Sequence, residues 1–301
     1  MKGHLMQESS WYGELKAKKS SVFDIIDDHY PALSKSQKKI ADYYLHNYDQ
    51  AVFMTARKLA QKLGTSESTV VRFAVSIGYK GFPQLQEHLR ESIKNVMTTK
   101  QRLTTKKEPR SLADNIRNSF ARDMADIKTT LDMLNVKNLE MIARKLMEAR
   151  RVYVIGNRSS KIIADYLVYY LNFFHADVYA AHHGVNEIFE QLNHLTKGDI
   201  VVIVNFPRYT SRTLEVAEFV HRIGTPIIAI TDAQDAPIVQ YATYELFASY
   251  SFDSFIDSHA ASMSLVNALI TAIAYENYEE ASQRLQKLEE LWKQYGTYYY
   301  G

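Results

Sequence analysis

The chain has 301 residues, of which 46% are hydrophobic and none is cysteine. This length favours two domains, and the lack of cysteine excludes disulfides, a thiol nucleophile and any cysteine-ligated metal site. The N-terminus has no apolar signal-peptide core and no stretch of about 18 apolar residues occurs, so we expect a cytoplasmic protein without a membrane span.

Charge is distributed unevenly along the chain, although the net charge is only +2. Residues 16–110 carry 18 Lys and Arg against 9 Asp and Glu, whereas residues 111–301 carry 17 against 23. The basic part is predicted to meet a polyanion and the acidic part to do something else. The alternative is a basic helical surface that is merely solvated.

Residues 22–97 are predicted to be entirely helical. A short helix capped by Thr55 ends at Gly64, where a C-cap glycine belongs, and a second helix begins after Ser66. Gly78 ends this second helix. A helix, a short turn with glycine and a second helix with small polar residues in its first turn indicate a helix-turn-helix. An ordinary helical hairpin with a capped second helix is the alternative.

The second helix of such a motif enters the major groove of DNA by its N-terminal end, and nearby basic residues reach phosphates. Arg72 follows two valines, so an interaction within the domain is the alternative for it. The residues predicted to contact DNA are Arg57, Lys58, Lys62, Ser66, Glu67, Ser68, Thr69, Arg72 and Lys80.

The stretch "LAQKLGTSESTVVRFAVSIGYKGFPQLQEHL" resembles the N-terminal domain of the RpiR/MurR-type bacterial transcriptional regulators. The resemblance covers roughly residues 20–97 and implies an all-α, winged-helix-like DNA-binding domain. The positions that match the family pattern are Leu59, Ala60, Gly64, Ser66, Thr69, Val70, Arg72, Phe73, Gly78, Tyr79, Gly81 and Phe82.

Four segments are predicted. Residues 20–97 form the helix-turn-helix domain, and residues 98–111, with threonine, basic residues and a proline but no hydrophobic period, form a linker. Residues 112–280 form a second domain that begins with two amphipathic helices, and residues 281–301 form a C-terminal helix and tail.

From Arg151 onward, apolar strands alternate with helices, which predicts an α/β domain with a doubly wound parallel sheet. Ligands on such sheets bind at the carboxyl ends of the strands, near the point where the winding direction reverses. The loops "GNRSS" and "NFPRYTSRT" leave the first and third strands, so they are expected to be neighbours in space.

This second block, over about residues 130–275, resembles the sugar isomerase (SIS) domain that RpiR-type regulators carry. The resemblance implies a phosphosugar held by a first loop of the form G-x-G-x-S and a second of the form S-x-S-G-x-T. Gly156, Ser160 and Thr210 match these patterns. The departures are Arg158 and Arg208 in place of one glycine in each loop, and Asn205 and Pro207 in place of two serines.

Two arginines at one strand-end crevice offer forked donors for a phosphate or carboxylate, so an anionic ligand is predicted. The alternatives are that the arginines fill the pocket or brace a contact between subunits. The predicted ligand-binding residues are Gly156, Asn157, Arg158, Ser159, Ser160, His183, Asn205, Arg208, Tyr209, Thr210, Ser211 and His259.

The combined expectation is a DNA-binding regulator, a repressor rather than an activator, of a carbohydrate or sugar-acid operon. It is expected to bind a palindromic operator as a homodimer or homotetramer, to sense an anionic sugar metabolite, and to need no metal or cofactor. One alternative is a sugar-phosphate isomerase with an accessory helical domain, in which His182, His183 and Glu187 would move protons. Another is a DNA-binding protein whose second domain only oligomerises.

Overall fold

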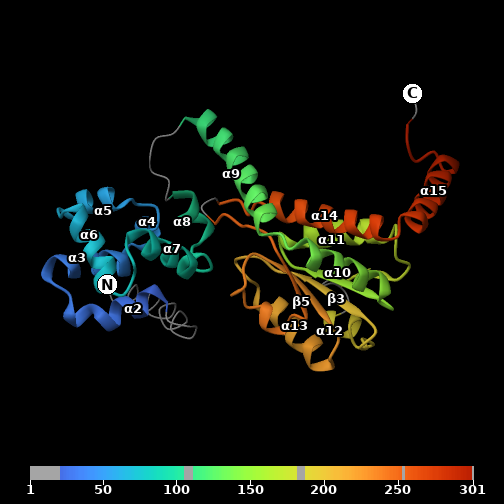
Figure 1. The fold of residues 1–301 in the computed structure, drawn as a ribbon, viewed down its shortest axis with the longest axis horizontal. Coiled ribbons are helices and arrows are strands. Elements are labelled where there is room, and N and C mark those ends of the chain that lie inside the picture. Colours follow the sequence, from blue (N-terminus) through green and yellow to red (C-terminus); the bar gives the residue numbers. More distant parts are fainter. Residues whose placement is uncertain (1–20, 105–110, 182–186, 253–254, 300–301) are drawn as a thin grey trace. The chain divides into compact units, whose positions relative to one another are not determined.

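The computed structural model describes residues 21–104, 111–181, 187–252 and 255–299. The chain forms two compact units, residues 1–108 with 253–255 and residues 109–252 with 256–301. Figure 1 labels their helices and strands, and each unit is described by itself. No helix among the described residues is long and apolar enough to cross a bilayer.

The described part of the first unit is helical. This confirms the predicted all-α domain, and no strand occurs among residues 21–104. Its elements are α2 (Val22–His29), the 3-10 helix η1 (Tyr30–Ala32), α3 (Lys35–His46), α4 (Tyr48–Ala51), α5 (Ala56–Leu63), α6 (Glu67–Ser76), α7 (Phe82–Ile93) and α8 (Thr99–Thr104). Helix α8 lies within the predicted linker, so part of that segment is helical.

The core of the first unit contains a pair of buried aromatic rings and a buried amide. The rings of Tyr44 and Phe73 lie 5.9 Å apart, and both side chains are fully buried. Gln86 on α7 donates from Nε2 to the carbonyl oxygens of Ala51 and Met54, each at 3.0 Å. These bonds fix α7 to the segment that precedes α5, since a buried amide stays in place only where it is hydrogen-bonded.

The second unit is an α/β domain, as the sequence predicted. Its elements are α9 (Leu112–Met133), α10 (Val136–Glu148), β1 (Val152–Gly156), α11 (Ser160–Leu171), β2 (Val178–Ala180), α12 (Ile188–Gln191), β3 (Ile200–Val204), α13 (Ser211–Ile223), β4 (Ile227–Thr231), the 3-10 helix η2 (Val239–Tyr241), β5 (Tyr244–Phe247), α14 (Ala260–Glu276) and α15 (Tyr278–Gln294). The predicted alternation of strands and helices is present. Helix α12 is short, and α14 begins at Ala260.

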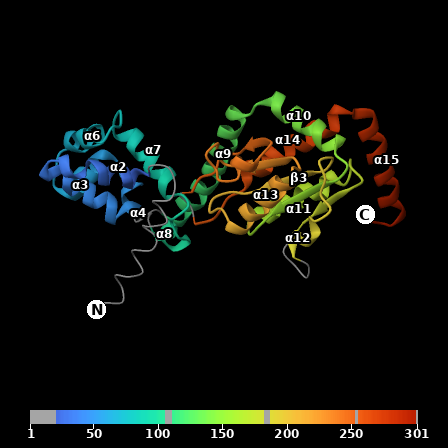
Figure 2. The same cartoon turned by 90° about the horizontal axis from the view of Figure 1, so that it is seen from below.

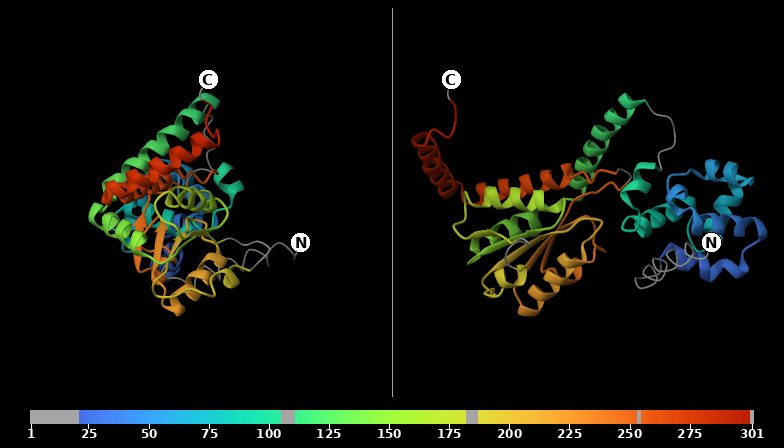
Figure 3. Two further views of the ribbon diagram at one scale, coloured as in Figure 1. Left: turned by 90° about the vertical axis from the view of Figure 1, so that its right-hand side faces the viewer. Right: turned by 180° about the vertical axis from the view of Figure 1, so that it is seen from behind.

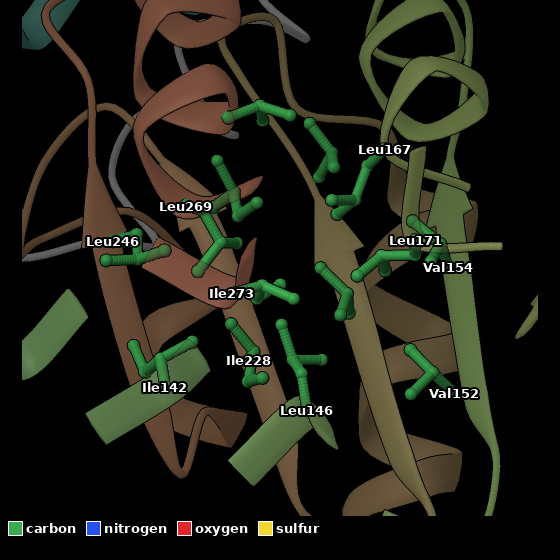
Figure 4. Close-up of a cluster of buried hydrophobic side chains, with 14 of the residues drawn as sticks. Ile142, Leu146, Val152, Val154, Leu167, Leu171, Ile228, Leu246, Leu269 and Ile273 are labelled. Carbon is green, nitrogen blue, oxygen red and sulfur yellow. The ribbon is translucent and has the colours of Figure 1, made fainter. Parts of the chain in front are cut away.

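The sheet is parallel, with strand order β2-β1-β3-β4-β5. Helices α10, α11 and α14 cover one face, with α10 and α14 side by side, and α12 and α13 cover the other (Figures 2 and 3). Alternate strand residues supply the two cores: Val152 and Val154 face the first layer, while Tyr153 and Ile155 face the second. Figure 4 shows the first cluster, in which Leu167 and Leu171 of α11 and Leu269 and Ile273 of α14 are among the side chains drawn.

An ion pair joins the amino ends of β1 and β3. Arg150 donates from Nε and Nη2 to the two carboxylate oxygens of Asp199, at 2.9 and 2.7 Å. The Asp199 side chain is fully buried, whereas that of Arg150 is half-exposed. Burial would raise the pKa of Asp199, but the hydrogen bonds from Arg150 and Thr196 outweigh it and hold that pKa below its usual range.

This pairing predicts a pH-dependent stability. The pKa of Asp199 is lower in the folded than in the unfolded chain. The carboxylate therefore stabilises the fold fully at pH values above its pKa in the unfolded chain, which is about 3.9. The stabilisation is lost as the pH falls through the lower, folded value. We expect Arg150→Met to lower the melting temperature by a few degrees at pH 7, with a deficit that shrinks below about pH 4.

The matched control is Arg144→Met, because Arg144 meets Glu276 at 3.4 Å and both side chains are partly exposed. An exposed pair contributes little, so this variant should change the melting temperature much less. Equal effects of the two substitutions across the pH range would show that the Asp199 pair has no special part in the fold.

Candidate functional site

Helix α6 is held at its start by side-chain hydroxyls. Ser66 is the N-cap residue, and its Oγ accepts from the amide of Thr69 at 3.2 Å. The same Oγ lies 2.9 Å from Oγ of Ser68 and 2.8 Å from Oγ1 of Thr69. Gly64, with φ of 62°, supplies the left-handed residue that ends α5. These caps confirm the predicted helix, glycine turn and second helix.

The two faces of α6 differ in the way a recognition helix requires. Val70, Phe73 and Ala74 are buried against the unit. The outer face exposes Glu67, Ser68 and Arg72 of the predicted set, and Arg72 also donates to Oγ1 of Thr69 at 3.4 Å. That bond is the within-domain interaction expected as the alternative for Arg72, and the guanidinium remains exposed.

Two residues on this outer face were not predicted. Val71 and Val75 are 38% and 54% exposed, one helical turn apart on α6. Their spacing from the buried Val70 and Ala74 would have revealed them, because i+1 residues lie on another side of a helix. Apolar side chains at such positions can contact the methyl group of thymine.

The predicted basic residues surround this face on the same unit. Arg57, Lys58 and Lys62 are exposed on α5, and Lys80 is exposed in the turn between α6 and α7. Together with Arg72 they are exposed basic residues on α5, on α6 and in the turn that follows α6, the kind of residue that contacts phosphates. Their roles in DNA binding remain predictions.

In the second unit, the winding direction reverses between β1 and β3. Strand β1 has β2 on one side and β3 on the other, with Gly156 opposite Val204. The loops that leave these two strands are therefore neighbours, as predicted. A hydrogen bond of 2.7 Å from Nδ2 of Asn157 to Oγ1 of Thr213 joins them directly. This is the place where sheets of this topology bind ligands.

Gly156 fixes the distance between the end of β1 and the start of α11. A Cβ atom at this position would lie 2.5 Å from the carbonyl oxygen of Ser160 and 2.9 Å from Cβ of Ala164. Only glycine permits this approach, because the contacts involve backbone atoms that cannot rotate away. Ser160 is accordingly buried in the first turn of α11, whereas Ser159 is half-buried.

Arg158 occupies the position where the family pattern has its second glycine, and its φ of 55° is left-handed. The loop therefore keeps the backbone conformation that glycine adopts most readily, with a guanidinium added. Arg158 and Arg208 are exposed, and neither guanidinium makes a hydrogen bond or ion pair with a described residue. Arg212 differs, because it is ion-paired with Glu187 and Glu215 and lies 4.7 Å from the ring centre of Phe189.

The second loop is held by a chain of hydroxyl groups. Thr210 Oγ1 and Thr213 Oγ1 lie 2.6 Å apart, and Thr213 is almost fully buried. Thr213 was not predicted, although its place three residues after Thr210 at the start of α13 puts both on one face. Tyr209 donates to Oδ1 of Asp232 at 2.6 Å, which ties this loop to the end of β4. Ser211 is exposed in the first turn of α13.

Two buried nitrogen atoms at this edge of the sheet lack a hydrogen-bond partner among the described residues. They are Nδ2 of Asn205, which is 3% exposed, and Nε2 of His259. Asn205 precedes Phe206, whose ring lies 5.7 Å from the imidazole of His259. Burial lowers the pKa of His259, so the ring is neutral at pH 7. Buried polar atoms are nearly always hydrogen-bonded, so these two indicate a place where a polar ligand group can bind.

The remaining predicted residues are not brought into this arrangement. His183 lies outside the described residues, as does His182, and Glu187 is exposed and paired with Arg212. No group of three or more metal-binding side chains occurs in the part of the chain that the structure describes. The structure thus joins Asn157 and Thr210 through Thr213, and brings the ring of His259 next to that of Phe206, the residue after Asn205.

Comparison with known families gives one match for each unit. Residues 21–96 match the helix-turn-helix domain of the rpiR family, and residues 145–272 match the SIS domain. A curated transcriptional regulator of the helix-turn-helix type from Haemophilus influenzae is 27% identical over 238 residues, which is 76% of this chain and 80% of that protein. The regulator HexR of Escherichia coli is 23% identical over 278 residues, 91% of this chain and 95% of HexR.

Solved structures agree on the fold. The Vibrio vulnificus NanR protein, solved in complex with ManNAc-6P, is similar with a TM-score of 0.56 and 20% identity, over 90% of this chain and 98% of that one. The sugar isomerase domain of an RpiR transcription factor from Sphaerobacter thermophilus is similar with a TM-score of 0.55 and 23% identity, over 60% of this chain and 99% of that one.

The contact at Gly156 predicts a large effect from a single methyl group. In Gly156→Ala, Cβ would lie 2.5 Å from the Ser160 carbonyl oxygen, so the start of α11 must move. We expect a loss of about 3 kcal/mol of unfolding free energy, measured by denaturant titration. Gly198→Ala is the control, because its nearest neighbour atom would be 3.7 Å away, and we expect a change within about 0.5 kcal/mol. Equal stability of the two variants would contradict the account of this contact.

Proposed function

Since the chain belongs to the RpiR family of transcriptional regulators, with a helix-turn-helix domain followed by a SIS domain, we propose a role for each domain. Helix α6 reads the major groove of an operator. The carboxyl edge of the sheet binds an anionic sugar metabolite. The observation that carries the ligand proposal is that two buried nitrogens, Nδ2 of Asn205 and Nε2 of His259, have no hydrogen-bond partner among the described residues, at an edge of the sheet whose loops also expose Arg158 and Arg208.

The capped and exposed start of α6 supports direct reading of bases. Short side chains there let the helix backbone approach the groove, and Ser68, Val71 and Val75 lie on the face turned away from the core. Ser66 is engaged in the cap, so its main task is to hold α6 in place. Arg57, Lys62 and Lys80 contribute phosphate contacts, which raise affinity without reading sequence.

The chemistry of the second site fits a phosphate or carboxylate on a polyhydroxylated molecule. Arg158 and Arg208 supply the positive charge and forked donors. Asn205 and the neutral His259 supply donor or acceptor groups for sugar hydroxyls, while Ser159, Ser160 and Ser211 line the starts of α11 and α13. The similar NanR protein was solved with the amino-sugar phosphate ManNAc-6P, which supports this ligand class.

We infer that ligand binding changes operator affinity and that the regulated genes serve the uptake or breakdown of that sugar, with repression in the absence of ligand. The change in affinity for DNA equals the ligand's difference in affinity between the DNA-bound and free forms. A change in DNA affinity on adding sugar must therefore be matched by a change in sugar affinity on adding DNA.

A sugar-phosphate isomerase is the alternative, and it would need an acid or base within reach of the substrate. Glu187, the carboxylate expected to move protons in that case, is ion-paired with Arg212. His259 is partly buried, which lowers its pKa, and its neutral ring could hydrogen-bond a hydroxyl group. Turnover of hexose or pentose phosphates in a coupled assay would favour the enzyme over the sensor.

Removing one phosphate-contacting charge should change how salt affects DNA binding. We expect Arg72→Met to weaken binding to the DNA beside the gene and to reduce the slope of log K against log salt by about 0.9. Fluorescence anisotropy at several salt concentrations measures both quantities. Arg90→Met is the control, because Arg90 lies on α7 and is paired with Glu87 at 3.1 Å. An Arg72→Met slope equal to that of the control would exclude Arg72 from the interface.

Removing an arginine at the sheet edge should weaken binding of the anion. A hydrogen bond to a charged group contributes about 1.5–3 kcal/mol, so Arg208→Ala is expected to raise Kd by roughly 10- to 100-fold. Calorimetry on the full chain with hexose 6-phosphates, amino-sugar phosphates and sugar acids gives these values. Arg222→Ala removes the same charge at the other end of α13, where Arg222 meets Glu218 at 3.9 Å, and should leave Kd unchanged.

The outcomes separate two failures. If a sugar anion binds equally well to the wild type and to Arg208→Ala, the sensor stands but Arg208 is not part of its site. If none of these compounds binds the wild type, the proposal of an anionic sugar ligand is wrong.

A further inference from the structure

Helix α6 exposes two apolar side chains on its outer face. Val71 and Val75 are 38% and 54% exposed, although the residues beside them on that face, Ser68 and Arg72, are polar. In the described part of the first unit, the only other large hydrophobic side chain that is exposed is Leu103, on α8. The two valines are thus an exception in a unit whose other large apolar side chains are at least partly buried.

The described core of the first unit does not require valine at these two positions. The side of α6 that faces the core is supplied by Val70, Phe73 and Ala74, which are buried. Valine is a weaker helix former than alanine, lysine or glutamate, because its branched side chain is restricted against the preceding turn. Sequences break such local rules mainly at functional sites. The exposed valines therefore indicate contact with another molecule.

The residues around this pair favour DNA as that molecule. Arg72 directly follows Val71 and is exposed, and further exposed basic side chains lie on α5 and in the turn after α6. The centre of a protein–protein interface is depleted of charge, whereas a surface that contacts DNA is polar and strongly positive. A role for the valines in base contacts rests on the proposed function, in which α6 enters the major groove.

Thymine is the base that offers valine an apolar contact in the major groove. Its edge carries a methyl group on C5, whereas the other bases present hydrogen-bond donors and acceptors but no methyl group. Valine has neither a donor nor an acceptor in its side chain. Packed against the edge of guanine, adenine or cytosine, it would take polar groups away from water without replacing their hydrogen bonds. Valine therefore selects thymine both by contact and by disfavouring the other bases.

The spacing of the two valines limits where the thymines lie. Four residues of an α-helix rise about 6 Å, whereas successive base pairs are about 3.4 Å apart. The two methyl groups are then about two base pairs apart or less. Valine also keeps one main χ1 rotamer in a helix, so little side-chain entropy is lost when it contacts a base.

We propose that Val71 and Val75 are specificity-determining residues of α6, and that each packs against the methyl group of one thymine in an operator half-site. The two thymines lie within about two base pairs of each other. Binding is then strongest to sites that carry thymine at both positions. The basic residues around the valines supply affinity that depends less on base sequence.

The test replaces thymine by deoxyuridine, which keeps every hydrogen-bonding group of the base and lacks only the methyl group. Duplexes that bind the full chain are first selected from a random-sequence pool, and the thymines of the selected site are then replaced one at a time. Fluorescence anisotropy at one salt concentration gives Kd for each duplex. We expect two replacements in a half-site each to raise the wild-type Kd about fourfold, as the loss of one buried methyl group should.

Alanine variants assign each thymine to one valine. Val75→Ala is expected to become indifferent to one of the two replacements, while the other still raises its Kd about fourfold, and Val71→Ala is expected to show the converse. Both positions are exposed and alanine favours a helix, so the fold should be kept, as circular dichroism would verify. The control Leu103→Ala removes an exposed apolar side chain from α8 and should respond to both replacements as the wild type does.

The outcomes distinguish failure of the thymine contacts from failure of the proposed function. The thymine contacts are excluded if the wild type selects a sequence but no replacement changes Kd. They are also excluded if both valine variants respond to every replacement as the wild type does. In these two cases the chain still binds an operator. If the wild type enriches no sequence from the pool, the proposed function is wrong and the thymine contacts are wrong with it.

Discussion

The close approach of α11 to the end of β1 at Gly156 is the constraint on which the proposed ligand edge of the second unit depends. Gly156 has no Cβ atom, so the carbonyl oxygen of Ser160 can lie close to it. A Cβ atom on residue 156 would be only 2.5 Å from that oxygen. The residues between them must then turn within three positions, and Arg158 takes a left-handed conformation to do so. This brings Asn157 within hydrogen-bond distance of Thr213, so one backbone contact determines how the two loops meet.

Arg158 shows how such a loop can change its chemistry without changing its path. A left-handed conformation costs a residue with a side chain about 1–2 kcal/mol, which glycine avoids. The chain keeps this conformation and gains a permanently charged group at the strand-end edge. In the second loop, Asn205 and Pro207 stand where the family pattern has serine hydroxyls, and Asn205 is buried. The site has thus exchanged neutral hydroxyl donors for guanidinium and amide groups, which fits a ligand with a strong anion and a polar body.

Much of the fold could be predicted because its signals are local. The caps at Thr55 and Ser66 and the glycine at position 64 appear directly in the sequence, and five runs of apolar residues separated by helices indicate a parallel sheet. The neighbouring positions of the two loops followed from strand direction alone. The missing partners of Asn205 and His259 could not be predicted, since they depend on side chains from distant parts of the chain.

Helix α9 marks the limit of periodicity as a guide. The spacing of its apolar residues predicts a helix with one apolar side, but periodicity does not say which side faces the protein. The orientation of α9 is determined by the segment after β5, in which the hydroxyl groups of Ser249 and Ser251 donate hydrogen bonds to Asp126. The buried carboxylate then holds the polar face inward, because turning the helix over would leave Asp126 without its donors.

A further hydrogen bond on the inner face of α9 connects this helix to the proposed ligand edge. Ser258 donates to Asp123 of α9 at 2.6 Å, and the next residue is His259, whose ring contacts Phe206 at the end of β3. Ser258 and His259 are consecutive residues. A ligand that displaces His259 therefore also acts on the hydrogen bond between Ser258 and Asp123 of α9. Helix α9 is also the first element of the second unit, so it is the element that the chain enters from the DNA-binding unit. The proposed coupling between sugar and DNA needs an element that both sites can bias. The polar bonds on the inner face of α9 link that helix to the proposed ligand edge, which makes it the candidate within the second unit.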